Sequence, residues 1–194
     1  MSIAAVILAA GASRRLGQPK QLLPHAGEAL LQRALRLVRE SGSEPILVVL
    51  GAEFARICVA IPFDDAIPVF NDRWEDGMAS SIHAGLNELD VRAPESKGAL
   101  VMGCDQPHLS SAHLRSLLKA FNEHKSSAIV ASSYAGVRGM PAVFPRTVFP
   151  ALHQIQGDKG ARGLLANPPI LIAEVEFVGG EVDIDIPDDL SHLQ

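Results

Sequence analysis

The feature that most constrains the fold is an alternation of short, continuous apolar runs with segments of helical period. The runs occupy residues 3–10, 45–50, 98–103, 127–132 and 170–177. Continuous apolar character, in place of an apolar and polar alternation, is typical of strands that are covered on both faces. The pattern therefore predicts strand, helix, strand units and a mostly parallel sheet.

Two stretches between these runs carry apolar residues at helical spacing. One begins at Leu30 and continues through Leu31, Ala34, Leu35 and Val38; the other follows Ser110 and Ser111 as a cap and holds Leu114, Leu117, Leu118 and Phe121. We predict a three-layer, Rossmann-like α/β fold in a single domain spanning residues 1–194. Segments 71–77 and 134–141 are interpreted as irregular loops that shape a pocket.

Composition narrows the classes of partner. The 194 residues are 47% apolar and 20% charged, with a net charge of −5 and no block rich in lysine or arginine. This balance argues against a nucleic-acid binder, and no stretch has the length of a membrane span. The first apolar run is short and precedes its basic pair, unlike a secretory signal. Cys58 and Cys104 lack metal-ligand spacing, so we expect a cytoplasmic, disulfide-free protein with small-molecule partners.

The segments that follow the predicted strands contain glycine, basic and acidic residues that could bind a ligand. After the first run comes GASRRLGQPK, where Gly11 and Gly17 permit tight turns and Arg15 and Lys20 supply positive charge. Such a loop suits a polyphosphate, although taken alone it also fits a solvated connection. It matches neither the dinucleotide fingerprint nor the P-loop. Asp105 follows the third run, and DIDIPDDL follows the last.

Six blocks in this order resemble the molybdenum cofactor cytidylyltransferases of the NTP transferase superfamily. They are LAAGASRRLGQPKQLLP (8–24), NDRWEDGMASSIHAGL (71–86), CDQP (104–107), YAGVRGMPAVFPR (134–146), GDKGARGLL (157–165) and DIDIPDDL (183–190). The resemblance implies magnesium-dependent transfer of CMP from CTP to a molybdopterin-type cofactor, with release of pyrophosphate. A molybdenum hydroxylase, or a factor for its maturation, is the macromolecular partner that this activity suggests.

The resemblance also implies roles for particular residues. Arg15, Lys20 and Asp105 are implied to be catalytic, the two cations gripping the triphosphate and the leaving pyrophosphate. The implied nucleotide contacts are Leu8, Ala9, Ala10, Gly11, Ser13, Arg15, Gly17, Lys20, Ser81 and Gly85. Arg138, Gly139, Lys159 and Arg162 are implied to line the acceptor pocket, against the alternative of solvated loop charges.

Carboxylates at two strand ends are candidate magnesium ligands. Asp105 suits a hard cation, although alone it could cap the helix that follows. Asp183 and Asp185 are two residues apart, so an extended chain points both to one face; we favour Asp185 as the second ligand. The neighbouring Asp188 and Asp189 suit the first turn of a closing helix. The family usually has threonine where this chain has Ile186.

Three alternative functions remain open at this point. The first is the same reaction with GTP; in the family the pair Ala9–Ala10 goes with cytosine, whereas guanine-using relatives carry a second glycine. The second is a cytidylyltransferase for another phosphorylated small molecule. The third is a non-catalytic protein that carries the cofactor to a molybdenum hydroxylase.

Overall fold

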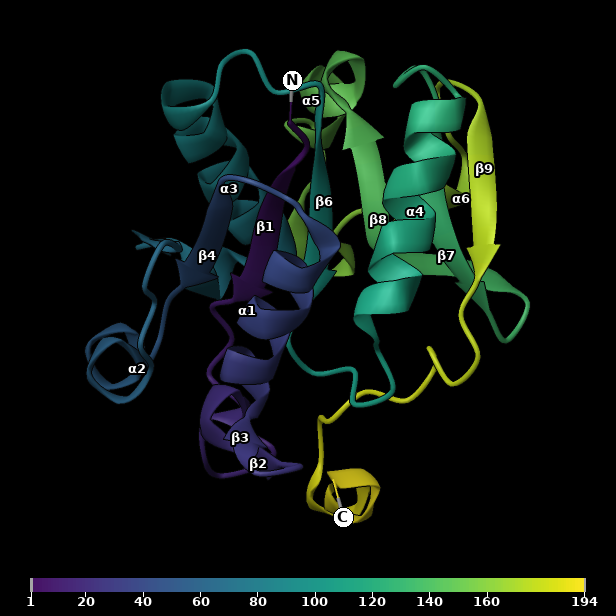
Figure 1. Ribbon diagram of the computed structural model, residues 1–194. Coiled ribbons are helices and arrows are strands. Elements are labelled where there is room, and N and C mark those ends of the chain that lie inside the picture. Colours follow the sequence, from purple (N-terminus) through teal and green to yellow (C-terminus); the bar gives the residue numbers. More distant parts are fainter. Residues whose placement is uncertain (1, 194) are drawn as a thin grey trace.

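A seven-stranded sheet forms the middle of this computed structural model, which describes residues 2–193 (Figure 1). The strand order is β5-β4-β1-β6-β8-β7-β9, and every neighbouring pair is parallel except the two that β8 makes with β6 and β7. The strands are β1 (Ala4–Ala9), β4 (Ile46–Leu50), β5 (Ile67–Phe70), β6 (Gly98–Gly103), β7 (Ile129–Tyr134), β8 (Val137–Pro145) and β9 (Ile172–Glu176). The prediction of an α/β fold with a mostly parallel sheet is confirmed.

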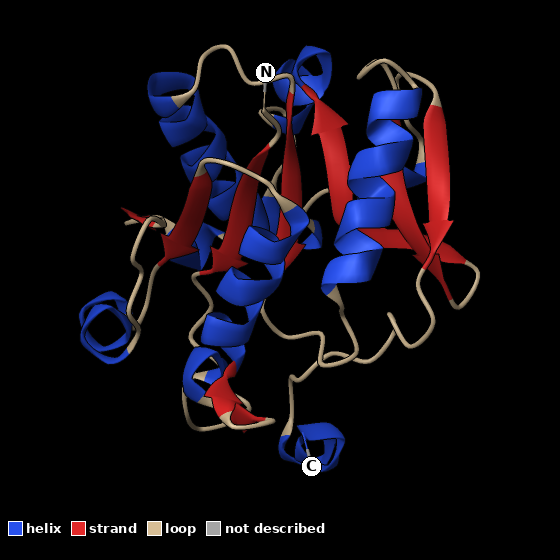
Figure 2. Ribbon diagram, in the orientation of Figure 1, coloured by secondary structure: helices blue, strands red, loops and turns tan. Residues whose placement is uncertain are grey.

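Helices cover both faces of this sheet and make the three layers (Figure 2). Side chains of α1, α2 and α4 join the core cluster on one face, and those of α3, α5 and α6 join the cluster on the other. The helices are α1 (Leu30–Ser41), α2 (Phe54–Ala60), α3 (Met78–Arg92), α4 (Ser111–Glu123), α5 (Phe149–Leu152) and α6 (Arg162–Ala166). A small hairpin of β2 (Pro24–His25) and β3 (Glu28–Ala29) precedes α1.

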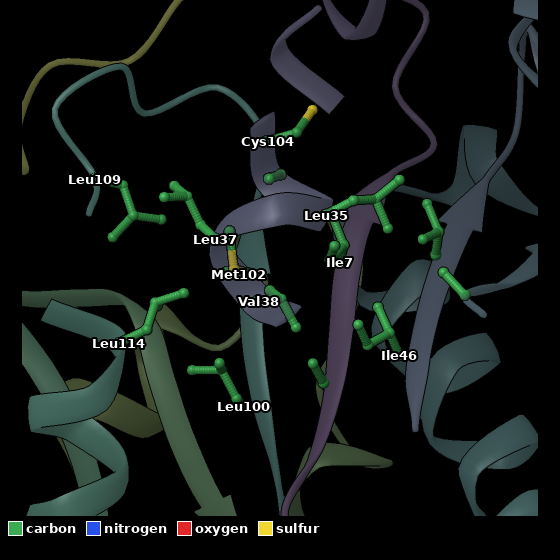
Figure 3. Packing of buried hydrophobic residues seen from close by; sticks show 14 of the residues in the cluster. Ile7, Leu35, Leu37, Val38, Ile46, Leu100, Met102, Cys104, Leu109 and Leu114 are labelled. Atoms are coloured by element: carbon green, nitrogen blue, oxygen red, sulfur yellow. The ribbon is translucent and has the colours of Figure 1, made fainter. Parts of the chain in front are cut away.

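The apolar runs and helical stripes form the core that the sequence predicts. Every residue of β4 is buried, because helices pack on both sides of this strand. Leu35 of α1 and Leu114 of α4 meet Ile7 and Leu100 of the sheet in one cluster (Figure 3). Ser110 is the N-cap of α4, since its hydroxyl accepts a hydrogen bond from the backbone N–H of His113 at 3.2 Å.

Five strands fall within two residues of the predicted apolar runs, but β5 and β8 were not predicted. Segment 134–141, interpreted above as an irregular loop, is instead the end of β7, a two-residue turn and the first half of β8. Arg138, Gly139 and Pro141 interrupt the apolar pattern there. The sheet accommodates them where the β7–β8 register shifts between Ala131 and Ser132, since irregular ladders tolerate proline and glycine.

The carboxyl ends of β4, β1 and β6 lie at one edge of the sheet, next to the C-terminal segment (Figure 1). The backbone N–H of Ile184 donates to the carbonyl of Asp105 at 3.0 Å, which joins the last segment of the chain to the residues that follow β6. A 3₁₀ segment, Pro187–Leu193, then holds Asp188 and Asp189 in its first turn. Polar residues from distant parts of the sequence therefore meet at this edge.

Two expectations from the sequence concern membrane-spanning segments and the state of the cysteines. Within residues 2–193, helices all fall short of the length and apolar character that crossing a membrane requires. Both cysteines are free thiols in the structure.

Gly85 of α3 offers a test of how closely this helix packs on the sheet. A Cβ at position 85 would overlap the side chain of Val6 in β1, and the side chain of Val49 in β4 would lie 3.1 Å away. We expect Gly85→Ala to lower the free energy of unfolding by about 1–3 kcal/mol because the core there has no spare volume. Gly163→Ala is the control, since a Cβ at this exposed helical position meets open space; equal losses in urea denaturation would contradict the packing argument.

Candidate active site

A pocket of about 610 Å³ opens at the carboxyl ends of β1 and β6. We call it the first pocket. Its lining combines residues 8–15, residues 74–78 except Asp76, the pair Cys104 and Asp105, and the single residues Lys20, Gln21, Ser81, Asp158 and Asp185. Ten predicted site residues are among them: Leu8, Ala9, Ala10, Gly11, Ser13, Arg15, Lys20, Ser81, Asp105 and Asp185.

Lys20 lies between two carboxylates in this pocket. Its ammonium Nζ is 2.6 Å from Asp105 Oδ2 and 2.7 Å from Asp185 Oδ1, and it also donates to the carbonyl of Ile184 at 3.3 Å. Burial opposes the charged form, but the attraction of Asp105 and the hydrogen bonds to both aspartates outweigh it and raise the pKa of Lys20. Lys20 is therefore held in its charged form, and its ammonium bridges the two carboxylates.

The pocket carries a second cation at its rim. Arg15 is 69% exposed along its side chain, and its Nη2 contacts Asp185 Oδ2 at 3.1 Å. An exposed pair of this kind is weak, so the guanidinium can exchange its partner at small cost. Arg15 can thus turn to an anionic ligand, whereas Lys20 must exchange two carboxylate partners to do so.

Asp185 and Asp183 have different environments, although the sequence placed both as candidate ligands. Burial alone would raise the pKa of Asp185, but the hydrogen bond and charge of Lys20 bring this pKa below its usual value. For Asp183, burial and then the charges of Asp105 and Asp185 raise the pKa, and its side chain is not part of the first pocket's lining. Asp105 and Asp185, the two ligands that the sequence analysis favoured, are the pair that converges on Lys20.

Asp189 fixes the backbone that presents Asp185. Its Oδ2 accepts hydrogen bonds from the backbone N–H groups of Asp185 and Ile186, each at 2.8 Å. The carboxylate thus anchors the loop as well as standing in the first turn of the 3₁₀ segment, the place the sequence analysis gave it. The side chain of Ile186 is exposed, and its backbone N–H is one of the two donors to Asp189.

Two side-chain networks shape the walls of the pocket. Gln21 is 1% exposed, and its amide Nε2 donates to the carbonyls of Ala9 and Gly11 at 2.6 and 3.1 Å. On the opposite wall, buried Asn71 donates to Ser80 Oγ at 2.8 Å and to Ser81 Oγ at 3.1 Å. Because Ser81 Oγ accepts from Asn71, its own hydroxyl proton can be donated to a ligand.

Three of the predicted nucleotide and acceptor residues, all glycines, lie outside the linings of the pockets described here. Gly85 packs α3 against β1 and β4 and is outside the first pocket's lining, as is Gly17, whose φ of +69° supports the turn before Lys20. Gly139 lies against the ring of Tyr134, where a Cβ would collide with the phenol oxygen. A glycine in a motif can therefore reflect close packing as readily as ligand contact.

The predicted acceptor cations are brought together only in part. Arg138 and Arg162 line a second pocket of about 610 Å³ with Tyr134, Gly136, Val137, Ala166 and Glu174. Arg138 Nε is paired with Glu174 Oε1 at 2.6 Å. Lys159 ends the 3₁₀ turn Gly157–Lys159 and belongs to the lining of neither pocket. Burial is the main cause of the raised pKa of Tyr134; the charge of Arg162 lowers this pKa, and the charges of Asp183 and Asp105 raise it. Tyr134 in the second pocket therefore feels the charge of Asp105 in the first.

The sequence analysis did not identify Gln21 or Asn71. Both are polar residues within motif blocks, but their roles depend on the path of the loops they support, and neither apolar period nor charge signals them. Cys104 also lines the first pocket; burial raises its pKa to about 12, so the thiol stays neutral near neutral pH and is a poor nucleophile.

Comparison with known families agrees with this architecture. The family described as the MobA-like NTP transferase domain matches residues 5–173. The chain belongs to this family. It is thus a member of a nucleotidyltransferase family, and the resemblance stated from the sequence blocks is confirmed at this level.

Two relatives are similar over nearly the whole chain, and a third over about three quarters of it. The nicotine blue oxidoreductase of Paenarthrobacter nicotinovorans is 33% identical, over 93% of this chain and 92% of that protein. The purine catabolism protein PucB of Bacillus subtilis is 34% identical over 95% and 92%. A probable molybdenum cofactor guanylyltransferase of Opitutus terrae is 28% identical over 74% and 67%.

Solved structures of the Mycobacterium tuberculosis protein Rv0371c have the same fold. One has a TM-score of 0.84 with 31% identity, covering 100% of this chain and 97% of that chain. A second, described as a complex with manganese, has a TM-score of 0.82 with 28% identity, covering 100% and 98%.

Gln21 provides a test of the support beneath the opening loop. We expect Gln21→Leu to lower the free energy of unfolding by about 1–3 kcal/mol, because the carbonyls of Ala9 and Gly11 lose a buried donor. Gln18→Leu is the matched control, being the same substitution at an exposed position of the same loop. Similar unfolding midpoints in urea for both variants would refute the supporting role of Gln21.

Proposed function

We propose that this protein transfers CMP from CTP to a phosphate of a molybdopterin-type cofactor and releases pyrophosphate. The observation that carries the proposal is the convergence of Lys20, Arg15, Asp105 and Asp185 in one pocket beside the loop that begins at Gly11. Cations beside backbone N–H groups suit a triphosphate, and paired carboxylates suit the metal that accompanies it. The relatives named molybdenum cofactor guanylyltransferases support the choice of acceptor class.

The chemistry needs little beyond orientation and charge. An oxygen of the acceptor phosphate forms a bond to the α-phosphorus of CTP while the bond from that phosphorus to the bridging oxygen breaks, and the electron pair leaves on pyrophosphate. Both reactants are anions, so cations must offset their repulsion and the charge that builds on the leaving group. In this proposal Lys20 and Arg15 contact the triphosphate and stabilise that charge.

Asp105 and Asp185 fit a divalent cation. Their carboxylate oxygens already converge on a single positive group, the ammonium of Lys20, with separations of 2.6 and 2.7 Å. Magnesium prefers oxygen ligands and commonly takes only one or two carboxylates from the protein, leaving water and phosphate oxygens to complete its shell. When bound, the metal supplies positive charge to the phosphates. Manganese in the Rv0371c complex supports a divalent ion for this family.

We assign the discrimination between cytosine and guanine to residues at the end of β1. Ala9 and Ala10 line the first pocket, and their methyl groups leave less room for a purine than the second glycine of guanine-using relatives would. Ser81, with its available hydroxyl proton, can donate to an acceptor on a pyrimidine ring. GTP remains the rival substrate because several relatives are named guanylyltransferases.

The second pocket is the proposed acceptor site. Arg162 and Arg138 supply positive charge there, and Arg138 can keep its bond to Glu174 while it contacts a phosphate. We propose further that the product passes to a molybdenum hydroxylase or to a factor for its maturation, in the cytoplasm.

The reaction is tested by pyrophosphate release from purified protein, Mg²⁺ and molybdenum-loaded molybdopterin, with CTP, GTP, ATP and UTP in separate reactions. We expect release with CTP and a rate lower by at least about a hundredfold with Asp105→Asn, since one charge of the converging pair is lost. Release with GTP alone would assign the guanine reaction. Binding of nucleotide without release from any of the four would favour the carrier, and release only with another phosphorylated acceptor would favour a different cytidylyltransferase.

Lys20 leads to a separate prediction about metal and stability. We expect Lys20→Met to lower the free energy of unfolding by about 1–2 kcal/mol without divalent ions, because Asp105 and Asp185 then face each other unscreened. Added Mn²⁺ should raise the melting temperature of this variant more than that of the original protein, since ligand binding stabilises the folded state. Lys97→Met, at an exposed lysine, is the control; an equal response to Mn²⁺ in all three proteins would contradict the account.

A further inference from the structure

Trp74 stands at a place in the first pocket that the proposed chemistry leaves unused. It begins the 3₁₀ turn Trp74–Asp76 between β5 and α3, and its side chain lines the pocket with Ala10 and Met78. The stem of Trp74 lies against Gly51, directly after β4, where a Cβ would be 2.5 Å from Trp74 Cβ. Trp74 therefore belongs to the β4 side of the pocket.

Lys20 and its two aspartates belong to the other side. Asp105 follows β6, and the sheet order puts β1 between β4 and β6. Neighbouring strands are about 4.8 Å apart, so the ends of β4 and β6 are separated by about 10 Å. The two ends of the pocket therefore differ: Trp74 stands at one end, beside the exposed pair Arg14 and Glu75, and the Lys20 cluster stands at the other. A nucleoside triphosphate has the same polarity, with a flat base at one end and phosphates at the other.

The indole is supported from behind and covered only loosely in front. It is half-buried and packs against the core cluster that contains Ala10 and Val49. The guanidinium carbon of Arg14 lies over the indole, 5.8 Å from the ring centroid, and Arg14 Nη2 pairs with Glu75 Oε1 at 3.0 Å. These two partners are 76% and 66% exposed, so both contacts are weak and a planar group can replace the guanidinium.

We propose that Trp74 is the platform on which the base of the bound nucleotide stacks, with Arg14 as its movable cover. The inference rests on the proposed function in so far as the first pocket takes a nucleoside triphosphate. Stacking on an aromatic face adds affinity for any base, so Trp74 contributes binding strength while the groups around Ala9, Ala10 and Ser81 select the base. Arg14 leaves Glu75 when the base enters.

The test uses the fact that Trp74 is the one tryptophan of the sequence. Its fluorescence is followed while the protein is titrated with CTP and, separately, with inorganic tripolyphosphate, which has charge but no base. We expect CTP to quench the emission strongly and tripolyphosphate, at concentrations that calorimetry shows to be saturating, to change it little. Equal quenching by the two ligands would overturn the proposal.

Calorimetry on variants separates stacking from a structural role. Trp74→Leu should weaken CTP binding about tenfold and leave tripolyphosphate binding within about twofold, whereas Trp74→Phe should keep most of the CTP affinity. Phe70→Leu is the matched control, because Phe70 is an exposed aromatic residue outside the first pocket's lining. Unchanged CTP affinity in Trp74→Leu, or equal loss of both ligands in Trp74→Leu and Trp74→Phe, would contradict the platform.

These outcomes are distinct from failure of the proposed reaction. One outcome is that CTP quenches the emission of the original protein, Trp74→Leu weakens CTP binding, and no pyrophosphate is released. This outcome would support the stacking role of Trp74 and refute the proposed transfer. If Trp74→Leu binds CTP as tightly as the original protein and pyrophosphate is released, the proposed transfer would be supported and the stacking role of Trp74 refuted. Failure of every nucleotide to bind the original protein would refute both.

Discussion

The contact of Lys20 with Asp105 and Asp185 is the interaction on which the site depends. It joins side chains that are 85 and 165 residues apart in the chain, and so connects the loop after β1, the end of β6 and the C-terminal segment. Each of these groups alone would be an ordinary charge at a strand end. Together they form a cluster with one ammonium and two carboxylates, whose excess negative charge suits a further cation and whose carboxylates already converge.

The sheet makes this convergence possible. Parallel strands end at the same edge, so loops that are distant in sequence must share one space there. The antiparallel strand β8 changes the direction of the chain on the other side of β6, and the second pocket forms beside its first residues. Under the proposed function, the two pockets give a nucleotide and an acceptor separate places, as a transfer between two anions requires.

Much of the fold follows from apolar period alone, since buried strands and helical stripes must be apolar wherever they lie. Strand β8 could not be predicted in this way, because Arg138, Gly139 and Pro141 interrupt its apolar pattern. The register shift that accommodates them depends on the pairing of β8 with β7. In the site, charge and position after a strand made Lys20 and Asp105 candidates, and both line the first pocket. The support from Gln21 could not be foreseen, because its hydrogen bonds exist only once the loop has its final path. Gly85 lies in the packing of α3 on the sheet and outside the first pocket's lining, and its sequence gives no sign of this because helix packing and ligand contact both favour glycine.

The most direct test is a crystal structure of the protein grown with CTP and Mn²⁺, with the metal located by its anomalous scattering. The account predicts manganese between the carboxylates of Asp105 and Asp185, with the ammonium of Lys20 turned to the triphosphate and the base at the Trp74 end of the pocket. Manganese bound elsewhere, or a triphosphate outside the first pocket with Lys20 still held by both aspartates, would contradict it.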